Sequence, residues 1–225
     1  INSWDVVNEA LNEDGTLRKS VFLNTLGEKY LVNAFKLAEK ADPKVDLYYN
    51  DYNIEEPAKR AGAIALIKKI KAEGGKVDGV GIQGHWRLQS PSIEEIEKSI
   101  LEYSALGIKV AFTELDITVL PNPWDLKGAD VNQNFGGSAK MNPYPKALPD
   151  SVQTQLAERY ASIFKLFLKH KDKISRVTFW GVHDGQSWLN DWPIKGRTNY
   201  PLPFDKDLKH KPAYESILKL KETRE

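Results

Sequence analysis

Residues 108–116 read IKVAFTELD, an apolar and β-branched run that leads directly into two carboxylates. A run of this length and composition, centred on residues 108–112, predicts a strand buried on both faces. The same arrangement, an apolar strand followed by polar side chains, recurs at four other places in the chain. These further strands are expected over residues 4–7, 45–49, 77–82 and 174–180.

Segments with helical periodicity separate the predicted strands. Helices are expected over residues 28–40, 56–73, 92–107, 151–170 and 212–221. The second of them ends at Gly74, since glycine tolerates the left-handed conformation of a helix cap. Strict alternation of strands and helices implies parallel pairing with right-handed crossovers. We therefore predict an α/β fold in one domain, interrupted by a long functional loop over residues 119–149.

Composition excludes several classes of function. With 32 Lys and Arg against 31 Asp and Glu, the net charge of +1 lacks the positive footprint of a nucleic-acid binder. The absence of cysteine excludes disulfides, thiolate metal sites and a cysteine nucleophile. No apolar run approaches the roughly 20 residues that span a bilayer, so no membrane partner is expected. Six Trp and nine Tyr favour a site that stacks on flat ligand faces such as sugar rings.

A pair of polar side chains follows each predicted strand. The pairs are Asn8 and Glu9, Asn50 and Asp51, Gln83 and His85, Glu114 and Asp116, and His183 and Asp184. The carboxyl ends of parallel strands build the active site of an α/β fold, and in a closed barrel they converge on one cavity. Any single pair could simply mark the end of a strand, but five together predict an active site.

Two of these side chains, Glu9 and Glu114, directly follow strands and suit the hydrolysis of an acetal. That reaction needs one carboxylic acid to protonate the leaving oxygen and one carboxylate to attack the sugar carbon. An isolated glutamate at a strand end is more commonly a salt-bridge or capping residue, so the assignment depends on its neighbours. Aromatic side chains bracket two strand ends and are expected to stack on sugars, with core packing as the alternative for each. They are Tyr49, Tyr52, Trp180 and Trp188.

Two other patterns do not support a cofactor or a metal. Residues 79–84 match the G-x-G-x-x-G spacing, but the glycines lie within a predicted strand and the next helix begins only near residue 92. A dinucleotide site needs a helix N-terminus directly after the glycines, so we expect close packing instead. The four histidines lack metal-ligand spacing, and His170 and His210 lie among lysines and are expected to be solvated.

Five segments together resemble glycoside hydrolase family 10, the endo-β-1,4-xylanases, in the order of that family. They are WDVVNE at 4–9, YNDYN at 49–53, GIQGH at 81–85, TELD at 113–116 and FWGV at 179–182. The resemblance implies a (β/α)8 TIM barrel to which this chain supplies strands 4 to 8. Residues 1–225 would then be the C-terminal part of a single catalytic domain, whose strands 1 to 3 come from a separate polypeptide or an upstream segment.

The resemblance also implies roles for individual residues in a retaining double displacement. Glu9 would be the general acid/base and Glu114 the nucleophile. Asn8 would contact the 2-hydroxyl of the sugar being cleaved, and Asp116 would orient the histidine of the sixth strand. The remaining substrate-binding positions are Gln83 and His85 near the nucleophile, Trp180 and Trp188 at the glycone end, and Tyr49 or Tyr52 at the leaving-group side.

The expected substrate is xylan or xylo-oligosaccharides, with no cofactor. Since a polymer cannot enter a cell, a secreted, periplasmic or cell-surface location is expected. One alternative is a β-glucanase or mannanase of the same clan, because these enzymes share the acid/base after an asparagine on strand 4 and the nucleophile on strand 7. The other alternative is a non-catalytic carbohydrate-binding barrel, against which the presence of both glutamates argues.

Overall fold

The computed structural model describes residues 1–123, 126, 132–133 and 135–222, the side chains of 221 and 222 excepted. All five predicted strands are present within these residues. They are β1 (Ser3–Asn8), β2 (Asp46–Tyr52), β3 (Gly79–Arg87), β4 (Lys109–Thr118) and β5 (Ile174–Phe179). Strands β3 and β4 extend past their apolar runs, so that His85, Glu114 and Asp116 lie within strands.

The five predicted helices are also present. They are α2 (Lys29–Ala41), α3 (Pro57–Ala72), α4 (Ile93–Ser104), α5 (Asp150–Lys169) and α6 (Pro212–Glu222). Gly74 follows α3 with φ of +83°, which confirms the predicted left-handed cap. A sixth helix, α1 (Val21–Leu26), was not predicted. It buries none of its side chains, so its sequence has no apolar period that would reveal it. The helix begins after Ser20, whose Oγ caps it by accepting from the Leu23 amide at 3.1 Å.

The long loop expected over residues 119–149 is only partly described. Residues 124–125, 127–131 and 134 of that loop lie outside the described residues. Its other residues include a single-turn 3-10 helix, η1 (Ala139–Met141). Two further 3-10 turns, η2 (Asp184–Gln186) and η3 (Trp188–Asn190), follow β5.

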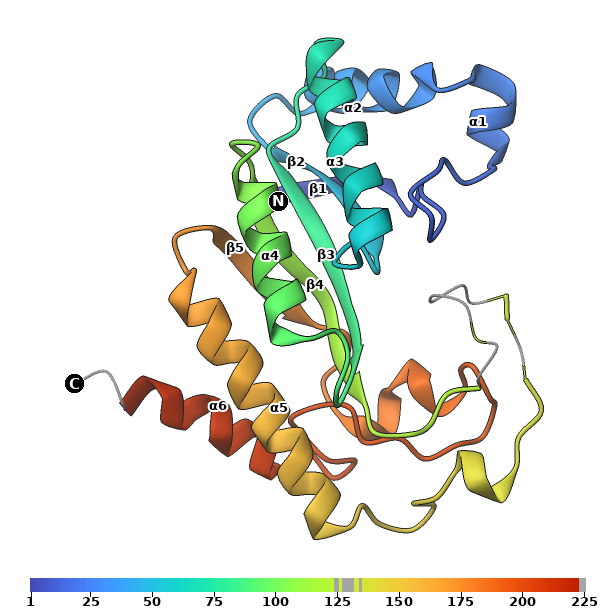
Figure 1. Cartoon of the computed structure of the whole chain (residues 1–225), viewed down its shortest axis with the longest axis vertical. Coiled ribbons are helices and arrows are strands. Elements are labelled where there is room, and N and C mark those ends of the chain that lie inside the picture. The colour runs from blue at the N-terminus through green and yellow to red at the C-terminus, as the bar shows by residue number, and fades with distance from the viewer. Residues whose placement is uncertain (124–125, 127–131, 134, 223–225) are drawn as a thin grey trace. The chain divides into compact units, whose positions relative to one another are not determined.

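The strands form one sheet in the order β1-β2-β3-β4-β5 (Figure 1). Strand β1 pairs with β2 in parallel, and β2 pairs with β3 in parallel, as predicted. In this register Asn8 lies opposite Asn50, and Tyr52 lies opposite Gln83, so the polar ends of three strands share one edge. The central strands are almost wholly buried, whereas the outer strands β1 and β5 are largely half-buried or exposed.

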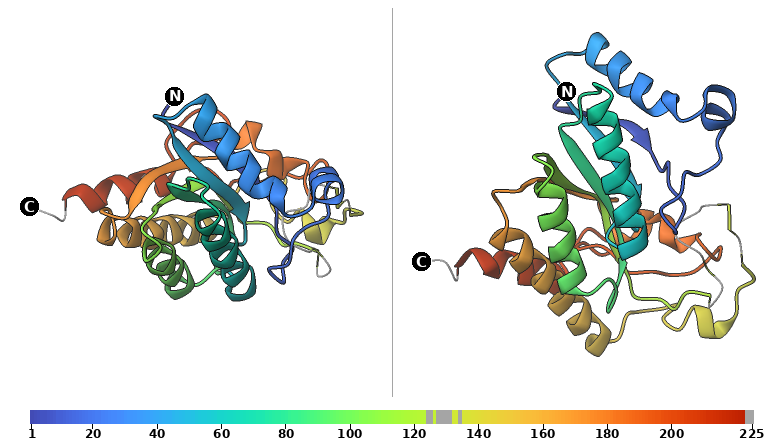
Figure 2. Two further views of the ribbon diagram at one scale, coloured as in Figure 1. Left: turned by 90° about the horizontal axis from the view of Figure 1, so that it is seen from above. Right: turned by 45° about the horizontal axis from the view of Figure 1, so that its top comes forward.

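The described residues form two compact units. The first unit comprises Ile1–Gln83, Glu94–Thr113 and Lys171–Val177, and the second comprises Gly84–Ile93, Glu114–His170 and Thr178–Glu225. In the first, α3 and α4 lie side by side (Figure 2), joined by ion pairs of Arg60 with Glu95 and Glu102, both at 2.8 Å. In the second, α5 packs against α6, and Ser216 Oγ donates to the carbonyl of Ala157 at 2.9 Å.

The glycines of the G-x-G-x-x-G segment serve close packing, as predicted. A Cβ at Gly79 would lie 2.2 Å from the ring of Tyr48, and one at Gly81 would lie 2.3 Å from Asn50 Oδ1. One prediction about histidines is confirmed and one is wrong. His210 is exposed and pairs with Glu215, whereas His170, the C-cap residue of α5, is only 9% exposed.

Candidate active site

Both candidate catalytic glutamates have an unusual backbone conformation. Glu9 directly after β1 has φ of 56°, and Glu114 within β4 has φ of 58°. Only four non-glycine residues among those described have positive φ, and these glutamates are two of them. Such conformations cost on the order of 1–3 kcal/mol and persist where the surroundings enforce them, commonly at functional sites. At Glu9 the main-chain amide donates to the carbonyl of Asn50 at 2.9 Å, which ties this conformation to β2.

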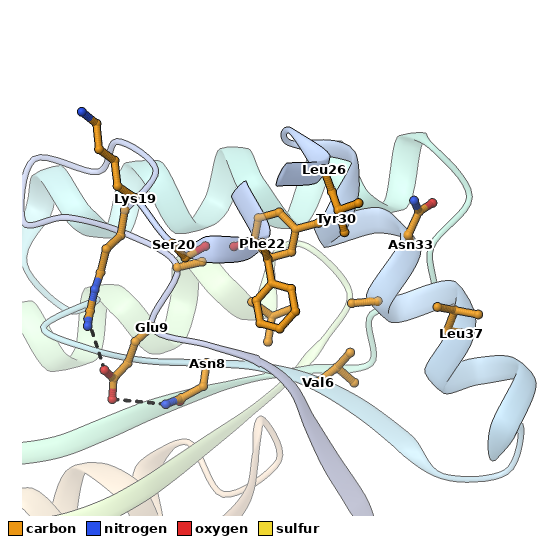
Figure 3. A pocket seen from close by; sticks show the side chains of 14 residues that line it. Val6, Asn8, Glu9, Lys19, Ser20, Phe22, Leu26, Tyr30, Asn33 and Leu37 are labelled. Carbon is orange, nitrogen blue, oxygen red and sulfur yellow. Dashed lines mark hydrogen bonds and ion pairs between the residues drawn. The ribbon is translucent and has the colours of Figure 1, made fainter. Parts of the chain in front are cut away.

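In the first unit, three side-chain contacts and partial exposure define the environment of Glu9, whose contact with Asn8 is drawn in Figure 3. Its Oε1 accepts from Asn8 Nδ2 and from Gln83 Nε2, each at 3.2 Å. Its Oε2 lies 3.3 Å from Arg18 Nη1, and the side chain remains 31% exposed. The carboxyl group is therefore held by neutral donors on one oxygen and by a cation on the other, while one side stays accessible to a ligand.

A chain of amides fixes the orientation of Asn8. Its Oδ1 accepts from Asn50 Nδ2 at 2.9 Å and from Gln83 Nε2 at 3.3 Å. The Oδ1 of Asn50 in turn accepts from Thr113 Oγ1 at 2.7 Å. With its oxygen occupied, Asn8 presents its NH2 group, of which one hydrogen goes to Glu9 and the other is available to an acceptor on a ligand.

In the second unit, His85 lies between two carboxylates. Its Nε2 is 3.1 Å from Glu114 Oε2, and its Nδ1 is 3.0 Å from Asp116 Oδ1. Asp116 is also fixed by Trp188, whose Nε1 donates to Oδ2 at 2.8 Å. Burial alone would lower the pKa of His85, but the charges and hydrogen bonds of Asp116 and Glu114 outweigh it and raise the pKa to about 9. The imidazolium therefore donates to both carboxylates at neutral pH.

Three tryptophans gather near His85 in the second unit. Trp188 contacts its ring with centroids 4.9 Å apart, and Trp180 lies edge-on to it at 6.3 Å. Trp180 is 47% exposed and offers a face to a ligand. Trp192, which sequence reasoning missed, stacks on Trp188 with centroids 4.6 Å apart. Its only sequence signal was its place four residues after Trp188 in the segment following the last strand.

The two tyrosines of β2 do not offer open faces. Tyr49 is fully buried, donates its hydroxyl hydrogen to Asp51 and accepts from the amide of Ala10 at 3.2 Å. The ring of Tyr49, expected to stack on a sugar, belongs to the core of the first unit. Tyr52 is 5% exposed, and the ammonium of Lys59 lies over its ring at 3.5 Å.

Lys59, which sequence reasoning also missed, has a fully buried side chain in α3. Its Nζ lies 3.0 Å from Asp51 Oδ1 and 3.4 Å from Glu13 Oε1. Burial raises the pKa of Asp51, and the nearby Lys59 charge opposes that shift. Asp51, expected at the rim of the site, is therefore a member of a buried ion pair that supports β2.

Asp184, one of the polar pair after β5, also has a structural role. Asp184 is 3% exposed and pairs with Lys211 Nζ at 2.8 Å, while accepting from the Leu202 amide at 2.9 Å. Burial raises the pKa of Asp184 to about 6 in spite of this lysine. Across the described residues, no group of three or more acidic or histidine side chains could hold a metal ion. The described helices likewise include none of the length and apolarity needed to cross a membrane.

Comparisons with known proteins agree with the resemblance seen in the sequence. The profile described as glycosyl hydrolase family 10 matches residues 1–220. An endo-1,4-beta-xylanase A from Xylanibacter ruminicola is 45% identical over 222 residues, which are 99% of this chain and 60% of that protein. A "thermostable celloxylanase" from Thermoclostridium stercorarium is 36% identical, covering 100% of this chain and 54% of that protein.

Solved structures match as well. A GH10 endoxylanase retrieved from sugarcane soil metagenome superimposes with a TM-score of 0.95 at 49% identity, over 98% of this chain and 64% of that one. The chain thus spans about 60% of the length of the curated xylanase from Xylanibacter ruminicola. The five-stranded parallel sheet with its helices is accordingly a portion of a (β/α)8 barrel, as the sequence predicted.

Proposed function

The chain belongs to glycosyl hydrolase family 10, and we propose that it carries both catalytic carboxylates of an endo-1,4-β-xylanase that acts with retention of configuration. One observation carries the proposal. Glu9 directly after β1 and Glu114 within β4 each have a left-handed backbone conformation, each is only partly exposed, and each is held by hydrogen-bonding side chains. Two carboxyl groups of this kind are what a double displacement requires.

In the first step, Glu114 attacks the anomeric carbon and forms a covalent glycosyl-enzyme, while Glu9 protonates the departing oxygen. Protonated His85 supports this step because it donates to Glu114 Oε2 and so fixes the orientation of that carboxyl group. In the second step water attacks the intermediate, Glu9 removes the proton from that water, and Glu114 leaves. The reaction requires the two carboxyl groups to come about 5–5.5 Å apart in the working enzyme.

Sugar recognition follows from the other polar and aromatic groups. The free hydrogen of the Asn8 amide would donate to the 2-hydroxyl of the sugar at the cleaved bond. Gln83, which donates to Glu9, would keep the carboxyl of the acid/base oriented during proton transfer. The exposed face of Trp180 and the indole of Trp188 would pack against the glycone sugars, since flat apolar rings suit the faces of xylose units.

We further propose that residues 1–225 are strands 4 to 8 of a single catalytic barrel that other strands complete. Among the described strands, β1 pairs only with β2 and so lies at one edge of the sheet, and Trp4 on it is 44% exposed. Beside this edge lies an apolar groove of about 540 Å³, lined by Val6 of β1 and by Phe22, Leu26 and Leu37 of the adjacent helices (Figure 3). A parallel strand and its helix would satisfy the free β1 edge and cover the groove.

A second candidate substrate is β-1,4-glucan. The relative from Thermoclostridium stercorarium is named a celloxylanase, and it aligns with the whole of this chain. Glucose and xylose units differ by one hydroxymethyl group, so discrimination depends on whether the sugar-binding site leaves room for that group. Xylan remains the first candidate because the relative with 45% identity is named an endo-1,4-beta-xylanase.

The similar proteins come from bacteria, among them Xylanibacter ruminicola and Geobacillus stearothermophilus. We propose that this protein acts outside the cytoplasm, because polymeric xylan does not cross a cell membrane. Fractionation of the source cells into medium, periplasm and cytoplasm, followed by xylanase assay of each, tests this location. Activity confined to the cytoplasm would contradict it and would favour short oligosaccharides as substrates.

The function is tested by assaying the protein that contains this chain on xylan, carboxymethyl-cellulose and mannan. We expect release of xylo-oligosaccharides, with proton NMR showing the β-anomer first. Glu114→Ala should abolish turnover, and Glu9→Ala should retain slow reaction only with aryl xylosides whose leaving groups need no proton. The control is Glu28→Gln, which alters an exposed ion pair with Lys69. Full xylan activity in either catalytic variant, or binding without hydrolysis in the unaltered protein, would overturn the proposal.

A further inference from the structure

Arg18 is brought to Glu9 by a loop that folds back on itself. After Glu9 the chain turns, and Leu11 and Leu17 form an antiparallel bridge across the turn. The amide of Arg18 then donates to the carbonyl of Ala10 at 2.7 Å. Leu11 is 1% exposed, so the loop is anchored in the core of the first unit. The position of Arg18 is therefore set by backbone pairing rather than by its own side chain.

The tip of this loop is braced from two directions. Within it, the amide of Thr16 donates to Asp14 Oδ1 at 3.0 Å, and Asn12 Nδ2 donates to Thr16 Oγ1 at 3.0 Å. Outside it, the backbone of Gly15 lies against Gly62 of α3 so closely that a Cβ on Gly62 would be 2.4 Å from the Gly15 oxygen. A loop fixed at its tip, at its base and by an internal turn holds the backbone of Arg18 beside Glu9.

The contact of Arg18 with Glu9 is specific to one oxygen. Asn8 and Gln83 donate to Oε1, whereas Arg18 Nη1 lies 3.3 Å from Oε2. Both side chains of the ion pair are about one third exposed, at 35% for Arg18 and 31% for Glu9. A cation beside a carboxyl group favours its ionised form. When Glu9 gives its proton to a leaving group, the negative charge that forms is the one Arg18 faces.

We propose that Arg18 is a positioning residue for the acid/base, which holds the Glu9 carboxyl and stabilises the carboxylate formed as the leaving group departs. This inference rests on the proposed roles of Glu9 and Glu114. It assigns Arg18 to one half of the reaction, because proton donation matters only where the leaving oxygen is too basic to depart unaided. Arg18 contributes little when the leaving group is already a stable anion.

The test compares substrates that differ in their need for a proton. Arg18→Met and Arg18→Lys are made in the protein that contains this chain, and kcat/KM is measured on xylohexaose and on 2,4-dinitrophenyl xylobioside. A charge-assisted hydrogen bond is commonly strong enough that its loss from Arg18→Met should slow xylohexaose cleavage by roughly 10- to 100-fold. Hydrolysis of the dinitrophenyl substrate should change by less than about threefold on the same grounds. Arg18→Lys, which keeps the cation, should recover most of the loss on xylohexaose.

The matched control is Lys19→Met. It removes a positive charge from the neighbouring residue, whose side chain points away from Glu9 in Figure 3. We expect both substrates to be cleaved by this variant as in the unaltered protein. If Arg18→Met does not fold, as judged by its thermal unfolding, Arg18→Gln provides the same comparison with a smaller neutral side chain.

Glu9→Ala is measured in parallel to separate the two proposals. Preserved xylohexaose cleavage in Glu9→Ala would overturn the proposed function itself. Suppose that Glu9→Ala loses xylohexaose cleavage but keeps slow hydrolysis of the dinitrophenyl substrate, as expected. An equal loss on both substrates in Arg18→Met would then mean that Arg18 is only a structural residue. Unchanged kinetics in Arg18→Met would also overturn the inference.

Discussion

At the scale of single residues, His85 makes the stability of the second unit dependent on pH. Its pKa is raised to about 9 in the folded protein, against an ordinary value of 6.5. The folded state therefore binds more protons than the unfolded state between these values, so stability falls as the pH rises through this window. The stabilisation is complete below pH 6.5, is lost by about pH 9 and corresponds to roughly 3 kcal/mol.

This prediction is checked by urea unfolding at several pH values from 6 to 10. His85→Gln removes the titrating group and should flatten the decline in unfolding free energy across this range. The comparison uses His210→Gln as a control, because that histidine is exposed on the far end of the chain, next to α6. If His85→Gln declines as steeply as the unaltered protein, then other groups cause the pH dependence and the role given to His85 is wrong.

The polar strand-end residues of the candidate site stand out in the sequence more clearly than the burial of its aromatic residues. Asn8, Gln83, His85 and Asp116 could be found because a strand end is a local feature that hydrophobic patterning locates. The burial of Tyr49 could not be predicted in the same way, because it depends on the tertiary packing around β2. Arg18 was missed for a similar reason, since a loop that folds back on itself leaves no periodic signal.

At the scale of secondary-structure elements, Gly62 in α3 links that helix to the loop after β1. Glycine to alanine in a helix interior normally stabilises a protein by roughly 1 kcal/mol. Here the sign should reverse, because a Cβ on Gly62 would lie 2.4 Å from the Gly15 oxygen and 2.6 Å from its Cα. We expect Gly62→Ala to lower the unfolding free energy by about 1–3 kcal/mol, the usual range for overpacking, as measured by denaturant unfolding.

The same variant should also report on the loop that carries Arg18. If the loop shifts away from α3, Gly62→Ala should lose activity on xylohexaose more than on 2,4-dinitrophenyl xylobioside. Gly107→Ala is the control, since that glycine has φ of +70° but a Cβ added to it would meet no atom within 4 Å. It should cost only the roughly 1–2 kcal/mol of a left-handed alanine and leave both activities intact. If Gly62→Ala is more stable than the unaltered protein, then the loop at Gly15 moves away from α3 without an energetic cost.

Lys59 of α3 and Asp51 of β2 form the buried ion pair that joins these two elements. Removing one partner leaves an uncompensated buried charge, so Lys59→Met should destabilise the protein by about 3–5 kcal/mol. The double variant Lys59→Met with Asp51→Asn removes both charges and should be more stable than the sum of the single losses predicts. Denaturant unfolding of the two single variants and the double variant measures this coupling. Additive losses would mean that the pair contributes no interaction energy.

The order of elements could be predicted because each strand and each long helix carries its own hydrophobic period. Helix α5 illustrates this, since its apolar period over residues 156–167 predicts a stripe that would cover one face of a sheet. Four members of that stripe, Leu156, Tyr160, Ile163 and Phe167, are buried, and the fifth, Phe164, is half-buried. Helix α1 illustrates the limit, because Val21, Phe22 and Leu26 are all more than half exposed in the structure. A segment whose apolar side chains stay largely exposed cannot be recognised by a period that reports burial.

At the scale of the whole molecule, apolar exposure is concentrated beside the β1 edge. Phe22 is 61% exposed, Leu26 57% and Leu37 65%, and these side chains line the groove next to Val6. Exposed apolar patches of this kind mark interaction surfaces. An open edge and an apolar groove at the same place together favour a strand and helix that pack there, which is the proposed completion of the barrel.

Replacing Phe22 and Leu37 by serine tests that completion. Both side chains are exposed in residues 1–225 alone, so the double variant should change the unfolding free energy of this chain by no more than about 0.5 kcal/mol per site. In a complete barrel the same side chains would be buried, and their loss should cost about 2–5 kcal/mol for each. Thermal and denaturant unfolding of both forms gives the comparison.

Leu101→Ser is the matched control, because Leu101 lies on α4, away from the β1 edge, and is 44% exposed. Its effect should be the same small value in the lone chain and in the complete protein. If the Phe22 and Leu37 variant is equally mild in both, then nothing covers the groove and the barrel is not closed beside β1. A large loss of stability in the complete protein alone would mean that these side chains become core residues when the missing strands pack. Their exposure in this chain would then reflect an open barrel, and packing of the missing strands would close it and bring its strand ends around one cavity.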